Sequence, residues 1–537
     1  MWQFFCILFT IVMKTKLILF FTLLIHSILI SQVVNIPDSN FKQYLVNNSN
    51  INTNNDEEIQ VSEAISFTGE IAIAYQAIST LTGLEEFINI TSLSLFSCSL
   101  NSINISSNTS LLKLDVSKNN LSVLNISEHT NLEELTFSEN NITSLDVSLH
   151  ISLTSIIGAK NALTSLNLST NTLLTTVDVS DNAIEGSLNL NSDNLVRMIA
   201  NNNKLTSVDL IMAPDLQFLG VKGNLLTVLD LSENKLLHQV DCSSNKIENS
   251  LQLNSTDLYS LDCSYNELTT LDTSVALGSL KLVDCSNNNL TALDFTSNIN
   301  VVQIDCERNL LTSLLVENLV VWLQVINCQY NMLTGLNIND NINLKRLSIY
   351  NNSFSSINVT NNIKLTNFYC SNNSLTELDL TKNTDLLHLD APRNNLVTVD
   401  VRNGNNTKIN SASEFRLTNN PNLQCVYVDN VTYSTDTWTQ IDASGTFVLN
   451  ETACKALNVN TYTINNVSIY PNPVLHNLDI KTKEQIKKVT FFNILGKKIK
   501  TSTSSKINVL DLKSGIYLLE ITLENETKIL KKIVKSI

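Results

Sequence analysis

The 537-residue sequence predicts a repeat solenoid, a parallel β coil closed by capping units and followed by a small all-β domain. The main observation is that short segments such as "LYSLDCSYNEL" recur along the chain, and each carries an asparagine at the same place. These asparagines follow one another at 21 residues, with two steps of 22, and Cys98 stands one step before the first, which gives about fifteen coils. The asparagines are Asn119, Asn140, Asn161, Asn182, Asn203, Asn224, Asn245, Asn266, Asn288, Asn309, Asn331, Asn352, Asn373 and Asn394.

Alternating side chains within each segment predict a short β-strand in every coil. In "LYSLDCSYN", Leu261 and Cys263 would point inward while Ser260 and Asp262 point outward. The backbone of a buried turn needs hydrogen-bond partners, and an asparagine amide can both donate and accept. We therefore expect Asn266 and its equivalents to stack as an internal ladder.

The pattern L-x-x-L-x-L-x-x-N-x-L, with a weaker second half such as "LTELDLTKN" in each coil, resembles the leucine-rich repeat in a short bacterial form. This resemblance implies a right-handed parallel β coil of about 15 coils over residues 81–410. Each coil of such a solenoid contacts only its neighbours, so the core extends in one dimension.

Six cysteines share the second inward strand position and would form a column inside the solenoid. A free cysteine behaves as a small hydrophobe, which is the interpretation we favour here. Metal binding is the alternative, but neighbouring strands in one column do not offer a tetrahedral site, and we expect no catalysis from these thiols. The six are Cys242, Cys263, Cys285, Cys306, Cys328 and Cys370.

The chain opens with an apolar segment in which Lys14 and Lys16 precede an apolar run that ends near the small residue Ser31. This layout predicts a secretory signal peptide over residues 1–31, with Met13 as the expected start. An uncleaved membrane anchor is the alternative. No other apolar run of the sequence is long enough to span a bilayer.

Residues 32–80 are expected to close the N-terminal end with a helix over residues 38–48, capped by Asp38 or Ser39. The following "NTNNDEEIQVSE" aligns with the calcium-binding loop of an EF-hand, although it begins with Asn and has Glu57 where the loop needs glycine. A weak calcium site and a metal-free helical cap both remain open. The candidate calcium ligands are Asn52, Asn54, Asp56, Glu58 and Glu63.

Residues 411–460 follow the last regular coil and resemble the C-terminal cap of bacterial surface leucine-rich-repeat proteins. Such a cap is needed because the end of a solenoid exposes a hydrophobic cross-section. A disulfide between Cys425 and Cys454 is expected in an oxidising compartment, with two unlinked thiols as the alternative.

The last segment, residues 461–537, contains "YPNP", "LDI", "NILGKKI", "LKSGIYLLEI" and "KKIVK". It resembles the type A C-terminal sorting domain of the type IX secretion system in Bacteroidetes. The resemblance implies export across the outer membrane, release or attachment at the surface, and the secretion machinery as a partner. Its alternating strands and glycine turns also predict a small β-sandwich. The motif residues are Tyr470, Pro471, Asn472, Pro473, Gly496, Gly515 and Tyr517.

Charge and motifs exclude several classes of function. The net charge is −15, and because residues 481–537 carry 13 Lys and 5 Asp or Glu, the remaining chain carries −23. An acidic solenoid argues against nucleic acid as a partner, since phosphate binding needs basic density. The sequence has no nucleophile elbow, H-E-x-x-H, P-loop or paired CxxC motif, so we expect no enzyme activity.

Outward strand positions predict a binding surface on the concave face of the solenoid. Four aspartates on successive coils would repel one another, which a basic ligand or a cation would relieve; solvation by water and nearby serines is the alternative. Three tyrosines beside them are typical anchors for proteins and sugars, with ordinary surface as the alternative. The candidate residues are Asp241, Asp262, Asp284, Asp305, Tyr330, Tyr350 and Tyr369.

Together these features predict a secreted or surface-attached binding protein that recognises a protein or glycan, similar in broad design to internalin-type adhesins. The repeat architecture alone does not identify a ligand. A structural surface or matrix component that associates with itself is the second hypothesis, and an enzyme is the third.

Overall fold

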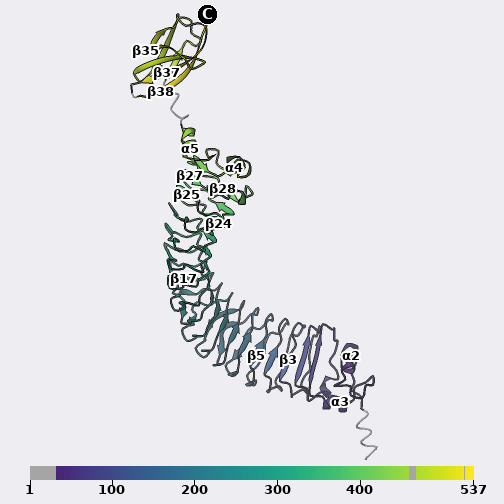
Figure 1. Cartoon of the computed structure of the whole chain (residues 1–537). Coiled ribbons are helices and arrows are strands. Elements are labelled where there is room, and N and C mark those ends of the chain that lie inside the picture. The colour runs from purple at the N-terminus through teal and green to yellow at the C-terminus, as the bar shows by residue number, and fades with distance from the viewer. Residues whose placement is uncertain (1–31, 459–466, 525, 537) are drawn as a thin grey trace, which may run out of the picture. The chain divides into compact units, whose positions relative to one another are not determined.

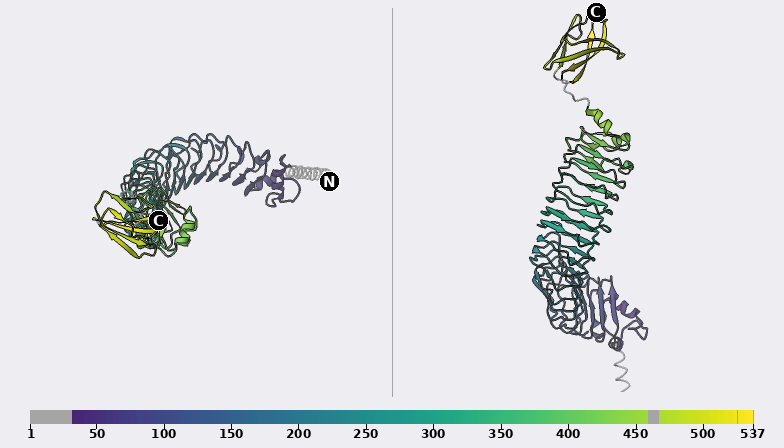
Figure 2. Two further views of the ribbon diagram at one scale, coloured as in Figure 1. Left: turned by 90° about the horizontal axis from the view of Figure 1, so that it is seen from above. Right: turned by 60° about the vertical axis from the view of Figure 1, so that its left-hand side comes forward.

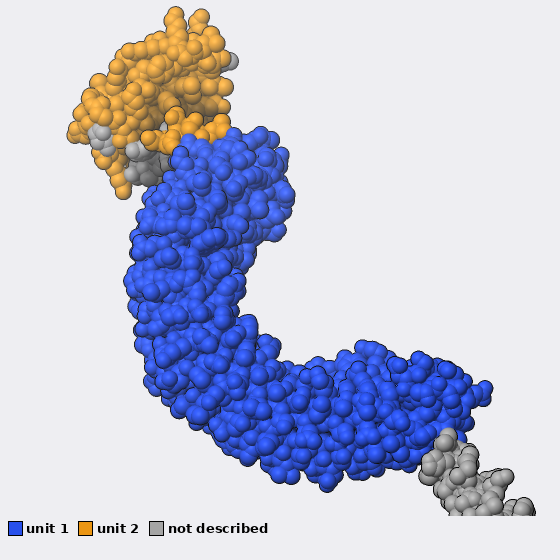
Figure 3. All heavy atoms as spheres, turned by 60° about the horizontal axis from the view of Figure 1, so that its bottom comes forward, with its two compact units in different colours: residues 1–447 blue, residues 448–537 orange. Residues whose placement is uncertain are grey.

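The computed structural model describes residues 32–458, 467–524 and 526–536. The chain divides into two compact units, Met1–Phe447 and Val448–Ile537 (Figure 3). The expected signal peptide, residues 1–31, lies outside the described residues. Within the described ranges, no helix combines the length and the apolar character needed to cross a membrane.

A helical cap begins the first unit. It contains the helices α2 (Ser39–Asn47) and α3 (Val61–Ser66), and the 3-10 helix η1 (Leu84–Glu86) follows the first strand. Asp38, and not Ser39, caps α2, because its Oδ1 accepts hydrogen bonds from the backbone N–H groups of Asn40 and Phe41 at 3.0 and 2.9 Å. Phe41 and Leu45 are fully buried and join the core of the solenoid, so the helix covers the N-terminal end of that core.

Eighteen parallel strands form one sheet along the solenoid (Figure 1). Neighbouring strands pair in register: Leu261 of β16 lies between Val240 of β13 and Val283 of β18. The strands are β1 (Glu70–Ala74), β2 (Ser92–Phe96), β3 (Lys113–Asp115), β4 (Glu134–Thr136), β5 (Ser155–Ile157), β7 (Thr176–Asp178), β9 (Arg197–Ile199), β11 (Phe218–Gly220), β13 (Gln239–Asp241), β16 (Ser260–Asp262), β18 (Leu282–Asp284), β20 (Gln303–Asp305), β22 (Val325–Asn327), β23 (Arg346–Ser348), β24 (Asn367–Tyr369), β26 (His388–Asp390), β28 (Phe415–Leu417) and β30 (Gln440–Ile441).

The sheet holds three more strands than the fifteen coils expected from the sequence. Strand β1 precedes the regular coils, and β28 and β30 follow them, in segments predicted to be caps. The alternation of β1 buries Ile71 and Ile73, but its coil lacks the leucine spacing of the repeat. At the other end, 26 residues separate Asn394 from Asn420, so the 21-residue period is lost although the coil continues.

Only some coils, from Asn167 onward, have a strand in their second half, and these strands form short sheets, which agrees with the weaker sequence pattern there. Two further views show the coils stacked one after another (Figure 2). The short sheets are β6 (Asn167–Leu168) with β8 (Glu185–Leu190) and β10 (Lys204–Val208); β12 (Asp230–Leu231) with β15 (Gln252–Leu253); β14 (Glu248–Ser250) with β17 (Glu267–Thr270); β19 (Ala292–Asp294) with β21 (Ser313–Leu315); and a four-stranded sheet of β25 (Glu377–Asp379), β27 (Thr398–Asp400), β29 (Cys425–Tyr427) and β31 (Thr446–Val448).

An asparagine ladder ties each turn to the preceding coil. The Oδ1 of Asn266 accepts a hydrogen bond from the Ile247 N–H at 2.9 Å, and its Nδ2 donates to the carbonyls of Cys242 and Cys263 at 3.0 and 3.1 Å. All fourteen asparagines of the 21-residue series bond to the neighbouring coil in this way. Asn420 adds a fifteenth member, which the sequence period does not reveal.

A second buried ladder, not identified from the sequence, runs along the turns that lead back into the large sheet. Its members donate to carbonyls of the preceding coil; Asn362, for example, donates to Ile338 and Asn341 at 3.0 and 2.9 Å. His129 and His150 occupy the same position and contact backbone carbonyls through Nε2. The polar members are Asn108, His129, His150, Asn171, Ser192, Asn234, Ser255, Asn298, Asn341, Asn362, Asn383 and Asn403.

An aromatic cluster closes the core near the C-terminal end of the first unit. Here η2 (Asn406–Lys408) and α4 (Val431–Thr437) follow the last regular coils. Trp438 is fully buried and stacks on Phe415 with ring centroids 4.0 Å apart, while its Nε1 donates to the carbonyl of Ile409 at 2.9 Å. The cluster gives the hydrophobic cross-section a well-packed end.

The second unit is a small β-sandwich preceded by α5 (Glu451–Asn458). A three-stranded antiparallel sheet faces a four-stranded one across a shared core that contains Ile480 and Ile507 from the first and Phe491 and Leu519 from the second. The strands are β32 (Val467–Tyr470), β33 (Asn477–Thr482) and β36 (Lys506–Asn508), then β35 (Lys498–Ser502), β34 (Ile486–Asn493), β37 (Gly515–Leu523) and β38 (Lys528–Lys535).

Candidate binding surface

The outward face of the large sheet carries one row of polar side chains in strict register. Asp241, Asp262, Asp284 and Asp305 lie directly opposite one another on β13, β16, β18 and β20. The same row continues through Asn327 and Ser348 to Tyr369. The structure thus brings the four aspartates together, and Tyr369 lies in line with them.

Serines of the same coils supply much of the hydrogen bonding to the acidic row. The hydroxyls of Ser243 and Ser264 donate to Asp241 and Asp262 at 2.7 and 2.6 Å, and the Ser286 N–H donates to Asp284 at 3.0 Å. These contacts favour the alternative that neighbouring groups solvate the row without a cation.

Asp305 ends the acidic row and is held from two strands. Its carboxylate accepts a 2.5 Å hydrogen bond from Gln303 and a short one from Asn327 on the next strand. It is therefore less available to a ligand than Asp262.

The surroundings of Asp284 perturb its carboxyl group. Burial raises its pKa, and the charges of Asp262 and Asp305 act in the same direction, against the hydrogen bonds from Ser286. Because the folded pKa lies above the unfolded one, the folded state favours the protonated form, and stability falls as the pH rises through the folded pKa.

We expect Asp284→Asn to raise the free energy of unfolding at pH 7 by about half a kcal/mol at most, with the gain disappearing below the unfolded carboxyl pKa near 3.8. Urea denaturation at several pH values measures this. The matched control is Asp272→Asn, because hydrogen bonds from Ser274 lower the pKa of Asp272 and its replacement should destabilise at pH 7. Equal effects of both variants at pH 7 would contradict the assignment.

Aromatic and cationic side chains gather beyond the acidic row, where the sequence pointed only to tyrosines. The rings of Tyr330 and Tyr350 meet edge to face at 5.2 Å, and the Arg308 guanidinium lies 4.3 Å from the Tyr330 ring centre. On the next strands, Arg346 lies 4.8 Å from the ring centre of Tyr369. Such cation–π contacts hold the rings in fixed positions on the surface.

Two more residues complete this cluster on β26 and β28. His388 packs against Tyr369 with ring centroids 4.8 Å apart, and burial lowers its pKa. Arg416 pairs with Asp390 at 3.1 Å. Sequence reasoning missed Arg308, Arg346, His388 and Arg416. For Arg346 and His388 a signal was available in the repeat, because both occupy the outward column two residues before the acidic row.

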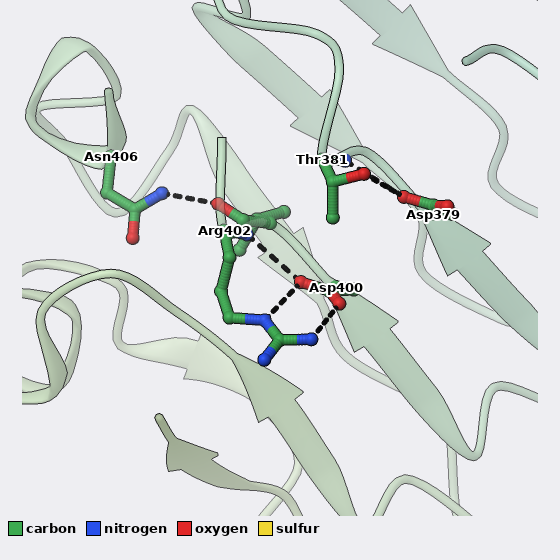
Figure 4. A network of polar contacts seen from close by, with 6 residues as sticks. Asp379, Thr381, Asp400, Arg402 and Asn406 are labelled. Carbon is green, nitrogen blue, oxygen red and sulfur yellow. Dashed lines mark hydrogen bonds and ion pairs between the residues drawn. The ribbon is translucent and has the colours of Figure 1, made fainter. Parts of the chain in front are cut away.

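A smaller row of the same kind lies on the four-stranded sheet in the second halves of the coils. Asp379, Asp400 and Tyr427 are in register, and Arg402 lies 4.9 Å from the Tyr427 ring centre. The Arg402 Nε also donates to Asp400 at 2.9 Å (Figure 4). Thr381 donates to Asp379. Their carboxylates are thus already bonded within the protein.

The EF-hand-like loop holds its own side chains through internal hydrogen bonds. Glu63 accepts from the N–H and hydroxyl of Thr53 at 2.7 and 2.8 Å and from the Asn54 N–H at 3.2 Å through Oε1, and from the Gln60 N–H at 3.0 Å through Oε2. Asn52 donates to the carbonyls of Val46 and Asp56 at 3.0 and 2.7 Å.

The side chains of the three remaining candidate ligands, Asn54, Asp56 and Glu58, are also engaged. Asp56 accepts from the Glu58 N–H and the side chains of Asn54 and Gln60, while Glu58 pairs with Lys42 at 2.6 Å. No group of three or more His, Cys, Asp or Glu side chains in the described parts of the chain is placed to hold a metal ion. This arrangement fits the metal-free cap better than an EF-hand site, and calcium binding stays a prediction.

We expect Glu63→Gln to lower the free energy of unfolding by about 1–3 kcal/mol in a chelating buffer, because an amide nitrogen cannot accept the hydrogen bonds of a carboxylate oxygen. Thermal unfolding with EDTA and with calcium measures this, and exposed Glu57→Gln is the control. A melting temperature that rises with calcium in the wild type and not in Glu63→Gln would instead establish a calcium site.

The column cysteines are inaccessible. All six, and Cys98, are free and buried. Burial raises the pKa of the Cys328 thiol to about 12 and also raises that of the other five. Thiolate chemistry needs a low pKa and exposure, so the column acts as hydrophobic packing. Cys425 and Cys454, by contrast, are both disulfide-bonded.

The motif residues of the second unit are structural parts of the sandwich. Asn472 of the "YPNP" segment accepts from the Val534 N–H at 2.7 Å and donates to the Lys532 carbonyl at 3.0 Å, which ties the first and last strands. The Tyr517 hydroxyl donates to the Lys513 carbonyl at 2.9 Å. Gly496 has a φ of +74°, which the turn between β34 and β35 requires. Tyr470 is half exposed.

Comparison with known proteins assigns the second unit and the fold of the first. Residues 468–536 match the family of secretion system C-terminal sorting domains. No curated protein sequence matches the chain. The sorting domain shows that the protein is secreted or attached at the outer surface through the type IX secretion system, whose machinery is thereby a partner.

Solved structures share the solenoid. The functional domain of InlJ from Listeria monocytogenes, described as including a cysteine ladder, has a TM-score of 0.54 and 23% identity, over 94% of this chain and 98% of that one. The plant peptide hormone receptor RGFR1 in complex with RGF2 has a TM-score of 0.55 and 19% identity, over 69% of this chain and 65% of that one. Both likenesses show the leucine-rich-repeat fold.

Proposed function

We propose that this secreted protein binds a protein or glycan ligand, in the manner of an adhesin, on the outward face of its large sheet. The observation that carries the proposal is that the acidic row continues into the cluster of tyrosine, arginine and histidine side chains around Tyr369. Tyr369 stands in the same row as Asp284, and Arg346 and His388 pack against its ring. Such a surface offers carboxylates, fixed aromatic rings and guanidinium groups side by side.

The frame beneath this surface supports recognition. Each outward side chain stands on a strand whose neighbours are fixed by the buried asparagine ladder. A rigid surface loses little conformational entropy on binding, and aromatic and arginine side chains are over-represented among residues that dominate binding energy. The carboxylates, aromatic rings and guanidinium groups of this surface can bind the hydroxyl groups of a sugar. They can equally bind the basic and amide groups of a protein.

We also propose that this surface works by binding and not by catalysis. The thiols of the cysteine column are buried with raised pKa values. The one histidine of the cluster, His388, has a lowered pKa because of burial, and it packs against an aromatic ring instead of a nucleophile.

The test is a binding screen of the chain from Gln32 onward against matrix proteins, bacterial surface proteins and a glycan array. We expect a ligand whose affinity falls at least about ten-fold in Tyr369→Ala and also weakens in Asp262→Asn, in the range of hot-spot truncations. The matched control is Tyr75→Ala, an exposed tyrosine near the N-terminal end of the same sheet.

Two outcomes would overturn the proposal. A ligand that binds equally well to Tyr369→Ala and Asp262→Asn would place recognition elsewhere. The absence of any ligand, together with ordered assembly in light scattering, would favour a structural surface component.

A further inference from the structure

An apolar stripe crosses five successive coils on the turns that lead into the large sheet. Its members are half exposed: Leu277 57%, Ile299 53%, Val320 41%, Ile342 46% and Ile363 52%, with Trp322 at 50% beside Val320. They share one repeat position, directly after the second ladder, so neighbouring members are about one strand spacing of 4.8 Å apart. We call these six residues the aliphatic stripe. A contiguous exposed apolar patch on a soluble protein marks an interaction site.

The repeat itself does not require apolar residues at this position. Other coils carry threonine there, as at Thr109, Thr130, Thr172 and Thr256, and an isolated isoleucine at Ile151. A hydroxyl side chain therefore suits the fold equally well.

The two coils of 22 residues also have their additional residue in this turn. Four steps separate Ala276 from Leu280, and Leu319 from Leu323, whereas three separate Asn341 from Leu344. In the second case the longer turn accommodates Trp322. Both departures from the 21-residue period thus fall in the stripe.

Three polar side chains next to the stripe are already bonded within the solenoid. Asn300 donates to the Gly278 carbonyl at 2.7 Å, and Asn343 donates to the Val321 carbonyl at 2.9 Å. Lys364 donates to Asn343 Oδ1 at 2.6 Å. Covering the stripe would leave these three side chains with their partners, which lowers the cost of burying it.

Charge points to the kind of partner. The buried ladder residue directly precedes each aliphatic residue, so the flanking positions are the one two residues before it and the one directly after it. Across the five coils these positions hold one acidic residue, Asp340, and one basic residue, Lys364, so the patch is neutral in a chain of net charge −15. Two copies of an acidic protein repel each other over most of their surface, and a neutral apolar patch is where that repulsion is smallest.

We propose that the aliphatic stripe binds the same stripe of a second copy of this chain. The five aliphatic positions are symmetric about Val320, so a twofold antiparallel arrangement pairs Ile299 with Ile342 and places Val320 against its counterpart. Both copies have the same rise per coil, so the side chains stay matched along the contact. The exposed fractions of the six residues amount to on the order of 550 Å² per copy, so a contact that covers them fully on both copies buries about 1,100 Å², close to the roughly 1,000 Å² that a specific interface needs.

Sedimentation equilibrium of the chain from Gln32 onward tests this dimer. We expect a dimer in the wild type and a dissociation constant at least about ten-fold weaker in the triple variant Ile299→Thr, Val320→Thr and Ile342→Thr. Threonine is native to this position elsewhere, so the variant should fold, which circular dichroism checks. Ile151→Thr, at the same repeat position outside the stripe, is the matched control and should leave the dimer unchanged.

A second variant tests contact directly. Val320→Cys should form a covalent dimer under mild oxidation, because the twofold arrangement brings the two new thiols together while the column cysteines remain buried, and Ile151→Cys should not. A monomeric wild type, or a triple variant that dimerises as tightly as the wild type, would overturn the proposal. The result is independent of ligand binding, since no stripe residue lies on the outward row of the sheet.

Discussion

Trp438→Ala is expected to lower the free energy of unfolding by about 3–5 kcal/mol, the range for truncating a fully buried large aromatic residue. The indole stacks on Phe415 at 4.0 Å, meets Phe447 edge to face at 6.0 Å and donates a hydrogen bond to the Ile409 carbonyl. Its removal leaves a cavity at the end of a one-dimensional core and takes one of two donors from the Ile409 carbonyl, which keeps the Tyr433 hydroxyl at 3.0 Å. Because coils stabilise only their neighbours, the loss should act first on the last coils.

Hydrogen exchange and urea denaturation followed by circular dichroism measure this effect. Exchange should accelerate in β26, β28 and β30 while β5 and β7 keep their protection. Tyr265→Ala, which truncates an exposed aromatic residue, is the control and should change stability by less than about 0.5 kcal/mol. A loss below 1 kcal/mol, or equal acceleration in β5, would show that Trp438 does not close the solenoid.

Asn266→Ala is expected to cost about 2–4 kcal/mol, because it breaks several hydrogen bonds to buried backbone groups at once. The amide of Asn266 is the partner of the Ile247 N–H and of the Cys242 and Cys263 carbonyls. These groups lie inside the turn, where alanine provides no substitute and water has little access. The substitution should therefore weaken the contact between two coils in the middle of the solenoid.

The measurement is again urea denaturation, with Asn289→Ala as the matched control. Asn289 is an exposed asparagine of the following coil, and its replacement should change stability by less than about 0.5 kcal/mol. Equal effects of the two substitutions would mean that the side-chain hydrogen bonds of the ladder contribute little to the stability of the solenoid.

The first asparagine ladder and the second one differ in how far the sequence reveals them. The first recurs as one residue type at a nearly constant interval, because its position needs a side chain that both donates and accepts. The second position needs mainly a donor to a carbonyl, so Asn108, His129 and Ser192 all serve. Their common spacing of 21 residues was present in the sequence, but the change of residue type concealed it.

The candidate surface shows the same division. The register of Asp241, Asp262, Asp284 and Asp305 follows from the repeat alone. The hydrogen bonds that these aspartates accept depend instead on side-chain conformations. Serine hydroxyls donate to Asp241 and Asp262, whereas Gln303 of the same strand donates to Asp305. The EF-hand-like loop is the clearest case: its spacing fits calcium ligands, but the folded cap turns Glu63 toward backbone N–H groups.

The sequence by itself determined the coil period, the inward and outward faces of each strand, the cysteine column and the sorting domain, because each depends on side chains at fixed intervals within one or two coils. The tertiary structure decided the eighteen-strand count, the second ladder and the contacts of Arg346 and His388 with Tyr369. It also showed which apolar residues the solenoid leaves exposed as the aliphatic stripe. These features depend on how neighbouring coils pack and on which rotamers their side chains adopt, and a linear pattern does not encode either directly.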